Sequence, residues 1–319
     1  MRIVDLTKET AENILENMLK RSPTQYGTYE AAVNEIVTAV REKKDAAVFS
    51  YTEKFDGAKL DASSVEVTEE EVEEAYRQVD EGLIDVIRKA RANILAYHEK
   101  QKENSWFTSA EEGTLLGQKV TPLNRVGVYV PGGKAAYPSS VLMNVLPAQV
   151  AGVREICMVT PCNREGKVNP VVLAAAKEAG VQRIFKIGGA QAVAALAYGT
   201  ESIPKVDKIV GPGNIYVALA KKAVYGNVSI DSIAGPSEIL VLADETANPR
   251  FVAADLLSQA EHDELASAIL ITTSRRLAEQ VDAEIRKFLE TLSRREIIEK
   301  SLDNFGYLLV AESKAEAIE

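Results

Sequence analysis

Histidine, cysteine and tryptophan are scarce in this sequence of 319 residues, which holds two, two and one of them. The two cysteines, Cys157 and Cys162, lie close together, and such a pair suits a reducing compartment better than a disulfide framework. Cys157 lies in an apolar run and Cys162 follows it, so packing and loop roles are favoured over a nucleophilic one. No Ser-His-Asp arrangement can be assigned.

Long hydrophobic runs are also missing. The longest apolar stretches, such as 141–153, fall short of the roughly 20 residues that cross a bilayer and are interrupted by Asn144 and Gln149. The N-terminus carries acidic residues early and has no apolar core, so no secretory signal is expected. We therefore predict a cytoplasmic protein with no membrane partner.

Positive charge is the third deficit. Lys and Arg number 37 against 47 Asp and Glu, for a formal net charge of −10, and no basic cluster stands out. This balance disfavours general nucleic-acid binding. An anionic ligand would need a local site of backbone amides or helix N-termini.

What is present is typical of a folded protein, with 46% hydrophobic and 26% charged residues. From 10 to about 103 the sequence predicts successive helices. One begins at Thr68, since Thr68 and Glu71 have the spacing of a capping box. Another buries one face through Leu83 and the apolar residues that recur at three- and four-residue spacing after it.

From Gly127 onward, short apolar runs alternate with Ala-rich helical runs, which predicts repeated βαβ units. Five strands are predicted at 126–130, 156–160, 183–187, 208–210 and 228–230, with helices near 141–151, 170–179, 190–198 and 215–224. A second alternating stretch places strands at 238–243, 268–273 and 306–310 and helices at 250–262 and 276–292.

The fold class predicted is α/β, with two Rossmann-like units, the middle one inserted into the other. We expect the first helical region to pack on the later sheet, because it carries little strand of its own. The expected boundaries are an N-terminal helical arm over 1–25, a first α/β domain split between 26–126 and 237–319, and an inserted α/β domain over 127–236.

Glycine gathers at four predicted strand ends, in the segments 130–133, 187–191, 211–214 and 234–237. In an open α/β sheet the carboxyl ends of the strands line the ligand crevice, and glycine lets backbone N–H groups approach a bound group. Each segment alone is usually a turn, but four together favour a ligand site. No Gly-x-Gly-x-x-Gly and no Walker A sequence occurs, so the ligand stays unassigned at this point.

Gln259 and His262, three residues apart near the end of a predicted helix, are the clearest candidates for metal ligands. Zinc accepts imidazole nitrogen and oxygen donors, so one helix could supply two ligands. A solvated polar helix end remains the alternative interpretation.

Five ordered segments resemble histidinol dehydrogenase. They are Gly127-Val-Tyr-Val-Pro-Gly-Gly-Lys134, 187–197, 206–214, Ala234-Gly-Pro-Ser-Glu238 and 256–263. The resemblance extends over essentially the whole chain and implies a fold related to aldehyde dehydrogenases. It also implies a zinc-dependent, NAD-linked homodimeric enzyme that oxidises histidinol through histidinal to histidine, the last step of histidine biosynthesis.

The resemblance also implies roles for six residues. Gln259 and His262 would be zinc ligands and, with Ser237, would contact substrate; Tyr129, Gln191 and Asn214 would contact NAD. The family's catalytic Glu-His pair and two further zinc ligands would lie beyond Glu319. We therefore expect an N-terminal portion of the enzyme that is inactive alone. The alternatives are a paralogous dehydrogenase of another small polar alcohol and a non-catalytic fragment that binds a nucleotide or a partner.

Overall fold

The computed structural model describes residues 1–19, 27–109, 113–132 and 137–319, and it divides into two compact units. Unit 1 combines Met1–Tyr26 with Gly235–Glu319, and unit 2 is Gly27–Ala234. Unit 2 is therefore inserted into unit 1, as the sequence predicts. Within the described ranges, no helix has both the length and the apolar character needed to cross a membrane.

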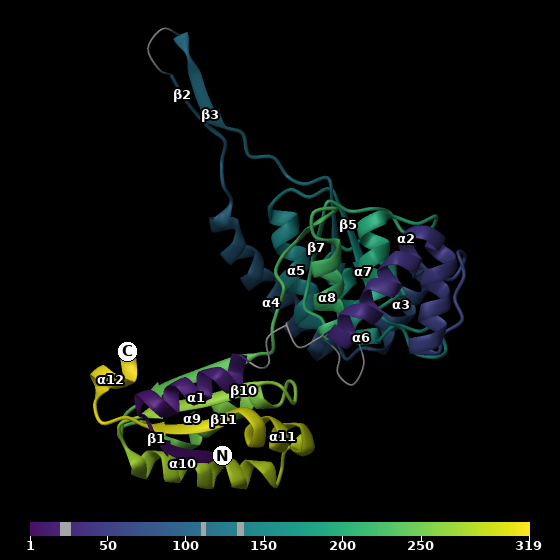
Figure 1. Ribbon diagram of the computed structural model, residues 1–319. Helices are drawn as coiled ribbons and strands as arrows, with labels where there is room; N and C mark the ends of the chain where they lie inside the picture. Colours follow the sequence, from purple (N-terminus) through teal and green to yellow (C-terminus); the bar gives the residue numbers. More distant parts are fainter. Residues whose placement is uncertain (20–26, 110–112, 133–136) are drawn as a thin grey trace. The chain divides into compact units, whose positions relative to one another are not determined.

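The sheet of unit 2 has five parallel strands in the order β6-β5-β4-β7-β8 (Figure 1). They are β4 (Arg125–Tyr129), β5 (Glu155–Val159), β6 (Arg183–Phe185), β7 (Lys208–Val210) and β8 (Ser229–Ile230). These strands lie within one or two residues of the predicted ones. Their apolar interiors fit a sheet that is covered on both faces.

The two faces of this sheet are distinguished by alternation along β4. Val126 and Val128 belong to the core beneath one pair of crossover helices, whereas Gly127 faces Leu196 on the other side. The crossover helices are α5 (Pro138–Val150), α6 (Pro170–Glu178), α7 (Gly189–Tyr198) and α8 (Ile215–Val224). All four were predicted from the sequence.

The helices that precede this sheet pack in the same unit. They are α2 (Gly27–Asp56), α3 (Glu69–Gln78) and α4 (Glu81–His98), which is followed by a 3₁₀ turn (Glu99–Gln101). Helix α2 packs on α7 and α8, α3 packs on α6, and α4 packs on α5. The capping box at Thr68 is present as predicted, with Glu71 N donating to Thr68 Oγ1 at 3.2 Å.

These contacts differ from the expected domain division. Residues 27–126 belong with the middle segment and not with the later sheet, because the apolar faces of α3 and α4 are buried in the core that α5 and α6 share. The expectation of a helical arm over 1–25 also differs from the structure. β1 (Arg2–Asp5) is a strand that pairs with β11, so the N-terminus is part of unit 1.

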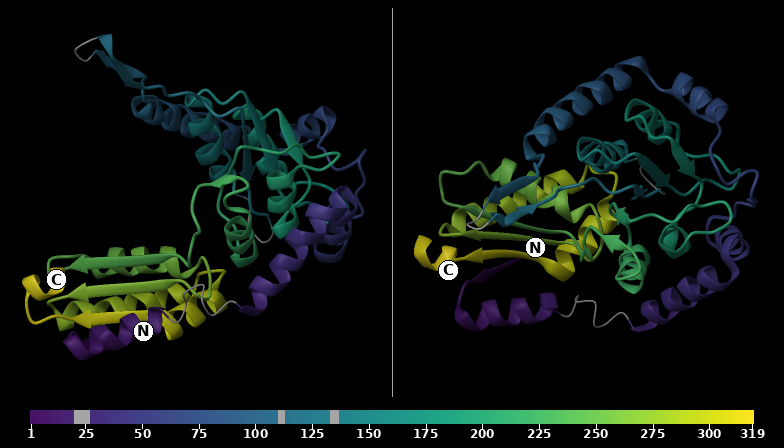
Figure 2. Two further views of the ribbon diagram at one scale, coloured as in Figure 1. Left: turned by 45° about the horizontal axis from the view of Figure 1, so that its top comes forward. Right: turned by 90° about the horizontal axis from the view of Figure 1, so that it is seen from above.

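Unit 1 holds four parallel strands in the order β1-β11-β10-β9, which Figure 2 shows side by side. The other strands are β9 (Glu238–Ala243), β10 (Ser267–Thr272) and β11 (Gly306–Val310). The helices are α1 (Lys8–Leu19), α9 (Pro249–Ala260), α10 (Arg275–Leu289), α11 (Arg295–Phe305) and α12 (Lys314–Ile318). Ile269 packs with Ile14 of α1, whereas Leu270 packs with α9, α10 and α11 on the opposite face.

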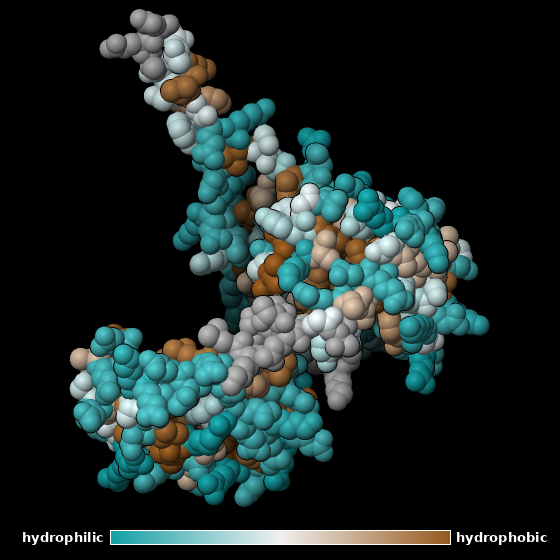
Figure 3. Space-filling model, viewed as in Figure 1, coloured by the Kyte–Doolittle hydropathy of each residue, from teal (hydrophilic) through white to brown (hydrophobic). Residues whose placement is uncertain are grey.

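A separate hairpin in unit 2 was not predicted. Strands β2 (Trp106–Ser109) and β3 (Leu115–Gln118) pair with each other in a two-stranded sheet. Every residue of both strands is exposed, and Figure 3 shows apolar side chains on the hairpin surface. A hairpin of two strands is marginally stable alone in water. The exposed apolar surface of the hairpin is therefore available for contacts with another molecule.

Candidate functional site

The strand order of unit 2 creates a switch point between β4 and β7. The chain leaves β4 toward β5 and β6 and then returns to β7 on the other side of β4. In an open α/β sheet, ligands bind in the crevice outside the carboxyl ends of the two strands at such a point. Three candidate residues from the sequence, Tyr129, Gln191 and Asn214, lie at strand or helix ends on this edge.

Tyr129 is the last residue of β4 and is only 4% exposed. Its hydroxyl oxygen accepts a hydrogen bond from the backbone N–H of Gly189, at the start of α7, at 3.0 Å. Burial raises the pKa of Tyr129 to about 12, so the phenol stays protonated at neutral pH. The end of β4 and the beginning of α7 are therefore fixed together by one buried side chain.

Gln191 lies in the first turn of α7 and is 1% exposed. Its Oε1 is buried and has no hydrogen-bond partner among the described residues. Leaving such an acceptor unsatisfied costs about 1–3 kcal/mol. A ligand that brings a donor into the crevice would remove that cost, which makes Oε1 the feature of this site that most directly indicates a bound group.

Asn214 caps the N-terminus of α8. Its Oδ1 accepts hydrogen bonds from the backbone N–H groups of Tyr216 at 3.1 Å and Val217 at 3.2 Å. These bonds hold an exposed residue in one orientation, and they engage only the oxygen of the side-chain amide. Helix N-termini also attract anionic groups. The loop before α8 can therefore present donors to an anionic ligand.

Gly211 brings this loop onto the end of β4. Its φ is +118°, and an added Cβ would lie 2.1 Å from the carbonyl oxygen of Tyr129. Only glycine permits so close an approach. Of the other glycines singled out in the sequence, Gly133 lies outside the described residues.

Asp56, at the end of α2, was not singled out in the sequence. Its Oδ2 is buried without a hydrogen-bond partner among the described residues, and burial raises the pKa of its carboxyl group. The charge of Asp56 contributes to the raised pKa values of Tyr129 and Cys162. Asp56 thus supplies a second buried acceptor that has no partner within the described part of the chain, close enough to Tyr129 and Cys162 for its charge to act on both.

Cys157 has the packing role that was favoured, and Cys162 lies in the loop after β5, as expected, with its side chain buried. Cys157 is inaccessible to solvent in β5, and burial raises its pKa to about 12. Cys162 is 8% exposed and donates a hydrogen bond from Sγ to the carbonyl oxygen of Lys186 at 3.4 Å. Burial raises the pKa of Cys162 to about 11. Neither thiol is a thiolate at neutral pH, so neither is an activated nucleophile.

The other three candidates lie at one edge of the sheet of unit 1. Ser237 directly precedes β9, and its carbonyl oxygen accepts from Ser267 N, at the start of β10, at 3.0 Å. Gln259 is in the last turn of α9, and its carbonyl oxygen accepts from His262 N at 3.1 Å. Gln259 is half-buried, whereas His262 and Ser237 are exposed. The helix ends at Ala260, two residues earlier than predicted, so His262 lies in the turn that follows α9 and not on the helix itself.

Within the described ranges, no group of three or more His, Cys, Asp and Glu side chains is arranged to hold a metal ion. Gln259 and His262 supply an oxygen and a nitrogen donor, which zinc accepts, but zinc usually takes four ligands. The donor chemistry of these two residues fits zinc as part of a ligand set.

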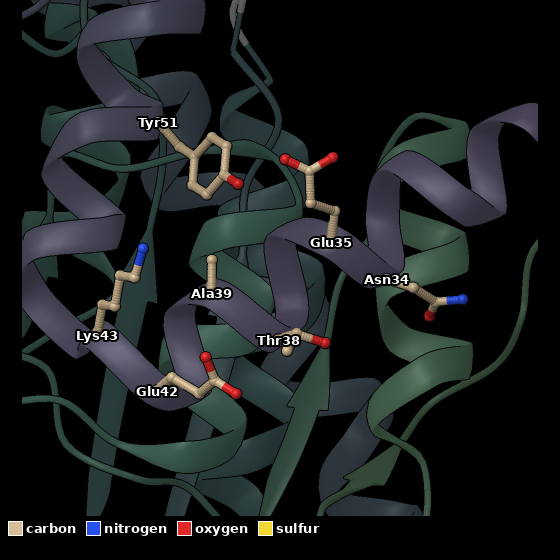
Figure 4. A pocket seen from close by; sticks show the side chains of 7 residues that line it. All are labelled: Asn34, Glu35, Thr38, Ala39, Glu42, Lys43 and Tyr51. Carbon is tan, nitrogen blue, oxygen red and sulfur yellow. The ribbon is translucent and has the colours of Figure 1, made fainter.

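A surface pocket of about 490 Å³ lies elsewhere, along α2 (Figure 4). It is lined by Asn34, Glu35, Thr38, Ala39, Glu42, Lys43 and Tyr51. The helix is interrupted beside it at Lys44, whose φ is +49°. None of the candidate residues from the sequence contributes to this pocket, and its lining comes from one helix.

The parallel sheet, its switch point and its crossover helices define an α/β protein of the doubly wound class, in which ligands bind outside the carboxyl ends of the strands. A family model for histidinol dehydrogenase matches residues 19–319. The chain belongs to the histidinol dehydrogenase family.

Curated relatives and a solved structure agree with this assignment. The chain is 57% identical over 310 residues to the histidinol dehydrogenase of Geobacillus kaustophilus, covering 97% of this chain and 73% of the relative. It is 59% identical over 303 residues to that of Bacillus subtilis, covering 94% and 70%. The crystal structure of histidinol dehydrogenase from Elizabethkingia anophelis matches with a TM-score of 0.91 and 38% identity, covering 100% of this chain and 72% of that one.

Proposed function

We propose that this protein performs the NAD-linked oxidation of L-histidinol through histidinal to L-histidine, the last step of histidine biosynthesis. Each oxidation transfers a hydride from the carbinol or hydrated aldehyde carbon to one NAD, so two NAD are reduced for each histidine formed. The family assignment supports the reaction. The main observation in support of the cofactor is the buried Oε1 of Gln191, which has no hydrogen-bond partner among the described residues.

In this proposal Tyr129, Gln191 and Asn214 bind NAD. The protonated Tyr129 hydroxyl is a donor, Gln191 Oε1 is an acceptor, and the N-terminus of α8 at Asn214 can receive a phosphate.

For the metal we propose zinc, held in part by Gln259 and His262. Zinc, when bound, would hold the amine and imidazole of histidinol and orient its carbinol carbon. Ser237 would contact the substrate from the same edge of the sheet. Removal of the carbinol proton needs a general base within hydrogen-bond reach, and none of these three residues is assigned that role.

We also propose that the protein is a homodimer in the cytoplasm. The exposed apolar residues of the β2-β3 hairpin support self-association, among them Trp106 at 55% exposure and Leu115 at 65%. Sedimentation velocity would test the dimer. A monomer at micromolar concentration would contradict it.

NAD binding tests the proposal most directly. Calorimetric titration with NAD should show saturable binding to the wild-type protein, and the Asn214→Ala variant should bind at least tenfold more weakly. Asn169→Ala is the matched control, since Asn169 also caps a helix of this unit, with its Oδ1 accepting from Val171 N at 2.9 Å. Both variants lose a cap worth about 1 kcal/mol. Equal NAD affinity in the two variants would contradict the assigned role of Asn214.

The reaction itself is tested by histidinol-dependent formation of NADH, with and without a chelator. Formation of NADH that the chelator abolishes and added zinc restores would support the full proposal. NAD binding without turnover of histidinol in any form of the enzyme would contradict the substrate and leave a nucleotide-binding role.

A further inference from the structure

Lys221 is a buried lysine that the proposed reaction does not use. It lies on α8 and is 3% exposed. Lysine is almost never fully buried unless it is paired. Its Nζ forms an ion pair with Asp231 Oδ1 and also donates a hydrogen bond to the carbonyl oxygen of Gly211 at 3.1 Å.

Asp231, which directly follows β8, completes the arrangement. Its Oδ2 accepts a hydrogen bond from the backbone N–H of Gly211 at 2.8 Å. The N–H and the C=O of Gly211 are therefore held by the two partners of one ion pair. A single glycine held at both of its polar groups has little freedom to move from its position.

The position of Gly211 determines where the following residues lie. Gly211 approaches the backbone of Tyr129 so closely that no side chain would fit, and three residues later Asn214 begins α8. Lys221 is on that same helix, two turns further on. The ion pair thus connects the end of β4, the loop after β7, helix α8 and the end of β8.

Stability alone gives little reason for this arrangement. Only the lysine side of this ion pair is buried: the side chain of Lys221 is 4% exposed and that of Asp231 is 32% exposed. Removing the Lys221 ammonium from water costs free energy that offsets much of its attraction to the partly exposed carboxylate. Around Lys221 the neighbouring helix positions, such as Ala220 and Val224, are fully buried and apolar, so an apolar side chain would pack well. The need to fix the geometry of the loop at Gly211 therefore explains the pair of Lys221 and Asp231 better than a gain in stability does.

We propose that Lys221 and Asp231 are positioning residues, which hold the loop from Gly211 to Asn214 in the conformation that binds the dinucleotide. The inference rests on the proposed function, because that function places NAD at Asn214. Neither residue contacts the cofactor in this account. They act through the backbone of Gly211.

The test compares NAD binding with stability in paired variants. The double variant Lys221→Met/Asp231→Leu removes both charges, so no unpaired charge is left buried. It should unfold within a few degrees of wild type, bind NAD at least tenfold more weakly and keep the wild-type affinity for histidinol. Lys221→Arg, which retains the charge and the donors, should recover part of the affinity for NAD.

Lys222→Met is the matched control. Lys222 is on the same helix, but it is exposed and pairs with Glu30 at the surface. This variant should bind NAD like wild type. Should the Lys221→Met single variant fail to fold, the double variant still decides the question.

The possible results distinguish the inference from the proposed function. A double variant that unfolds like wild type and binds NAD within twofold of wild type overturns the inference alone. An equal loss of affinity for NAD and histidinol, in parallel with a large loss of thermal stability, overturns it in favour of a structural role. Absence of NAD binding by the wild-type protein overturns the proposed function, and the inference with it.

Discussion

The two sets of candidate residues differ in how the fold holds them. In unit 2, Tyr129 and Gln191 are 4% and 1% exposed, and they lie within the packed end of a five-stranded sheet. In unit 1, His262 and Ser237 are exposed at the edge of a four-stranded sheet. Tyr129 and Gln191 are part of the core, so binding and folding should be coupled at these two residues, whereas Asn214 of the same unit is exposed. His262 and Ser237 can be substituted with little effect on folding.

The largest effect is expected at Gly211. Gly211→Ala places a Cβ 2.1 Å from Tyr129 O at a φ of +118°, so the loop must move. We expect a loss of about 3 kcal/mol or more in the free energy of unfolding, from backbone strain and overpacking together, and loss of NAD binding. Urea denaturation and calorimetry measure the two effects.

Gly226→Ala is the control for that experiment. Gly226 has a φ of +96° but nothing within 4 Å of an added Cβ. The Gly226→Ala variant should lose only about 1–2 kcal/mol in the free energy of unfolding, which is the cost of placing alanine in this backbone conformation. A Gly211→Ala variant no less stable than Gly226→Ala would mean that the close approach to Tyr129 does not constrain the loop.

Gln191→Leu should lower the affinity for NAD without lowering the free energy of unfolding, and so distinguish the two roles of a buried residue. Leucine has a similar volume and removes an acceptor that has no partner in the described residues, so the free energy of unfolding should stay the same or rise by about 1 kcal/mol. The affinity for NAD should fall at least tenfold. A variant that is clearly less stable than wild type would show that Oε1 is satisfied in solution and does not await a ligand.

Asp56 gives a pH-dependent prediction for the same edge. Burial raises the pKa of Asp56 in the folded state above its unfolded value, so its ionised form destabilises the fold at neutral pH. Asp56→Asn should therefore be more stable than wild type at pH 7. The difference should shrink as the pH falls through the folded pKa, and it should vanish below the unfolded pKa. Urea denaturation at several pH values measures the difference in the free energy of unfolding between the two proteins. A difference that grows as the pH falls would contradict the prediction.

The smallest effect on stability is expected at His262. His262→Ala should change the free energy of unfolding of the metal-free protein by less than about 0.5 kcal/mol, because the side chain is exposed. Zinc binding, measured with a competing chelator, should weaken at least tenfold. His98→Ala is the control, since His98, at the end of α4, is the only other histidine in the sequence. Equal zinc affinity in both variants would exclude His262 as a ligand.

Much of the fold was predictable because its signals are local. The predicted strand at 208–210 and helix at 215–224 coincide with β7 and α8, and the capping box at Thr68 starts α3. Apolar runs, helical spacing and capping residues each act within a few positions of the chain. The β2-β3 hairpin gave no such signal, since its strands are short and exposed throughout.

The placement of the first helices was not predictable in the same way. Helix α4 has an apolar face that the sequence reveals, but the pattern does not say which sheet that face will cover. The same holds for β1, whose four residues become a strand only by pairing with β11. Such choices depend on partners far away in the chain.

The sequence by itself determined the α/β alternation, the insertion of one unit into another, and six candidate residues that the family resemblance singled out. Only the tertiary structure decided that Gln191 and Asp56 have buried acceptors without partners in the described ranges, and that Lys221 and Asp231 together hold Gly211. The physical reason is that periodicity and capping depend on neighbours in sequence. Burial, hydrogen-bond satisfaction and charge pairing depend on groups that the folded chain brings together from distant positions.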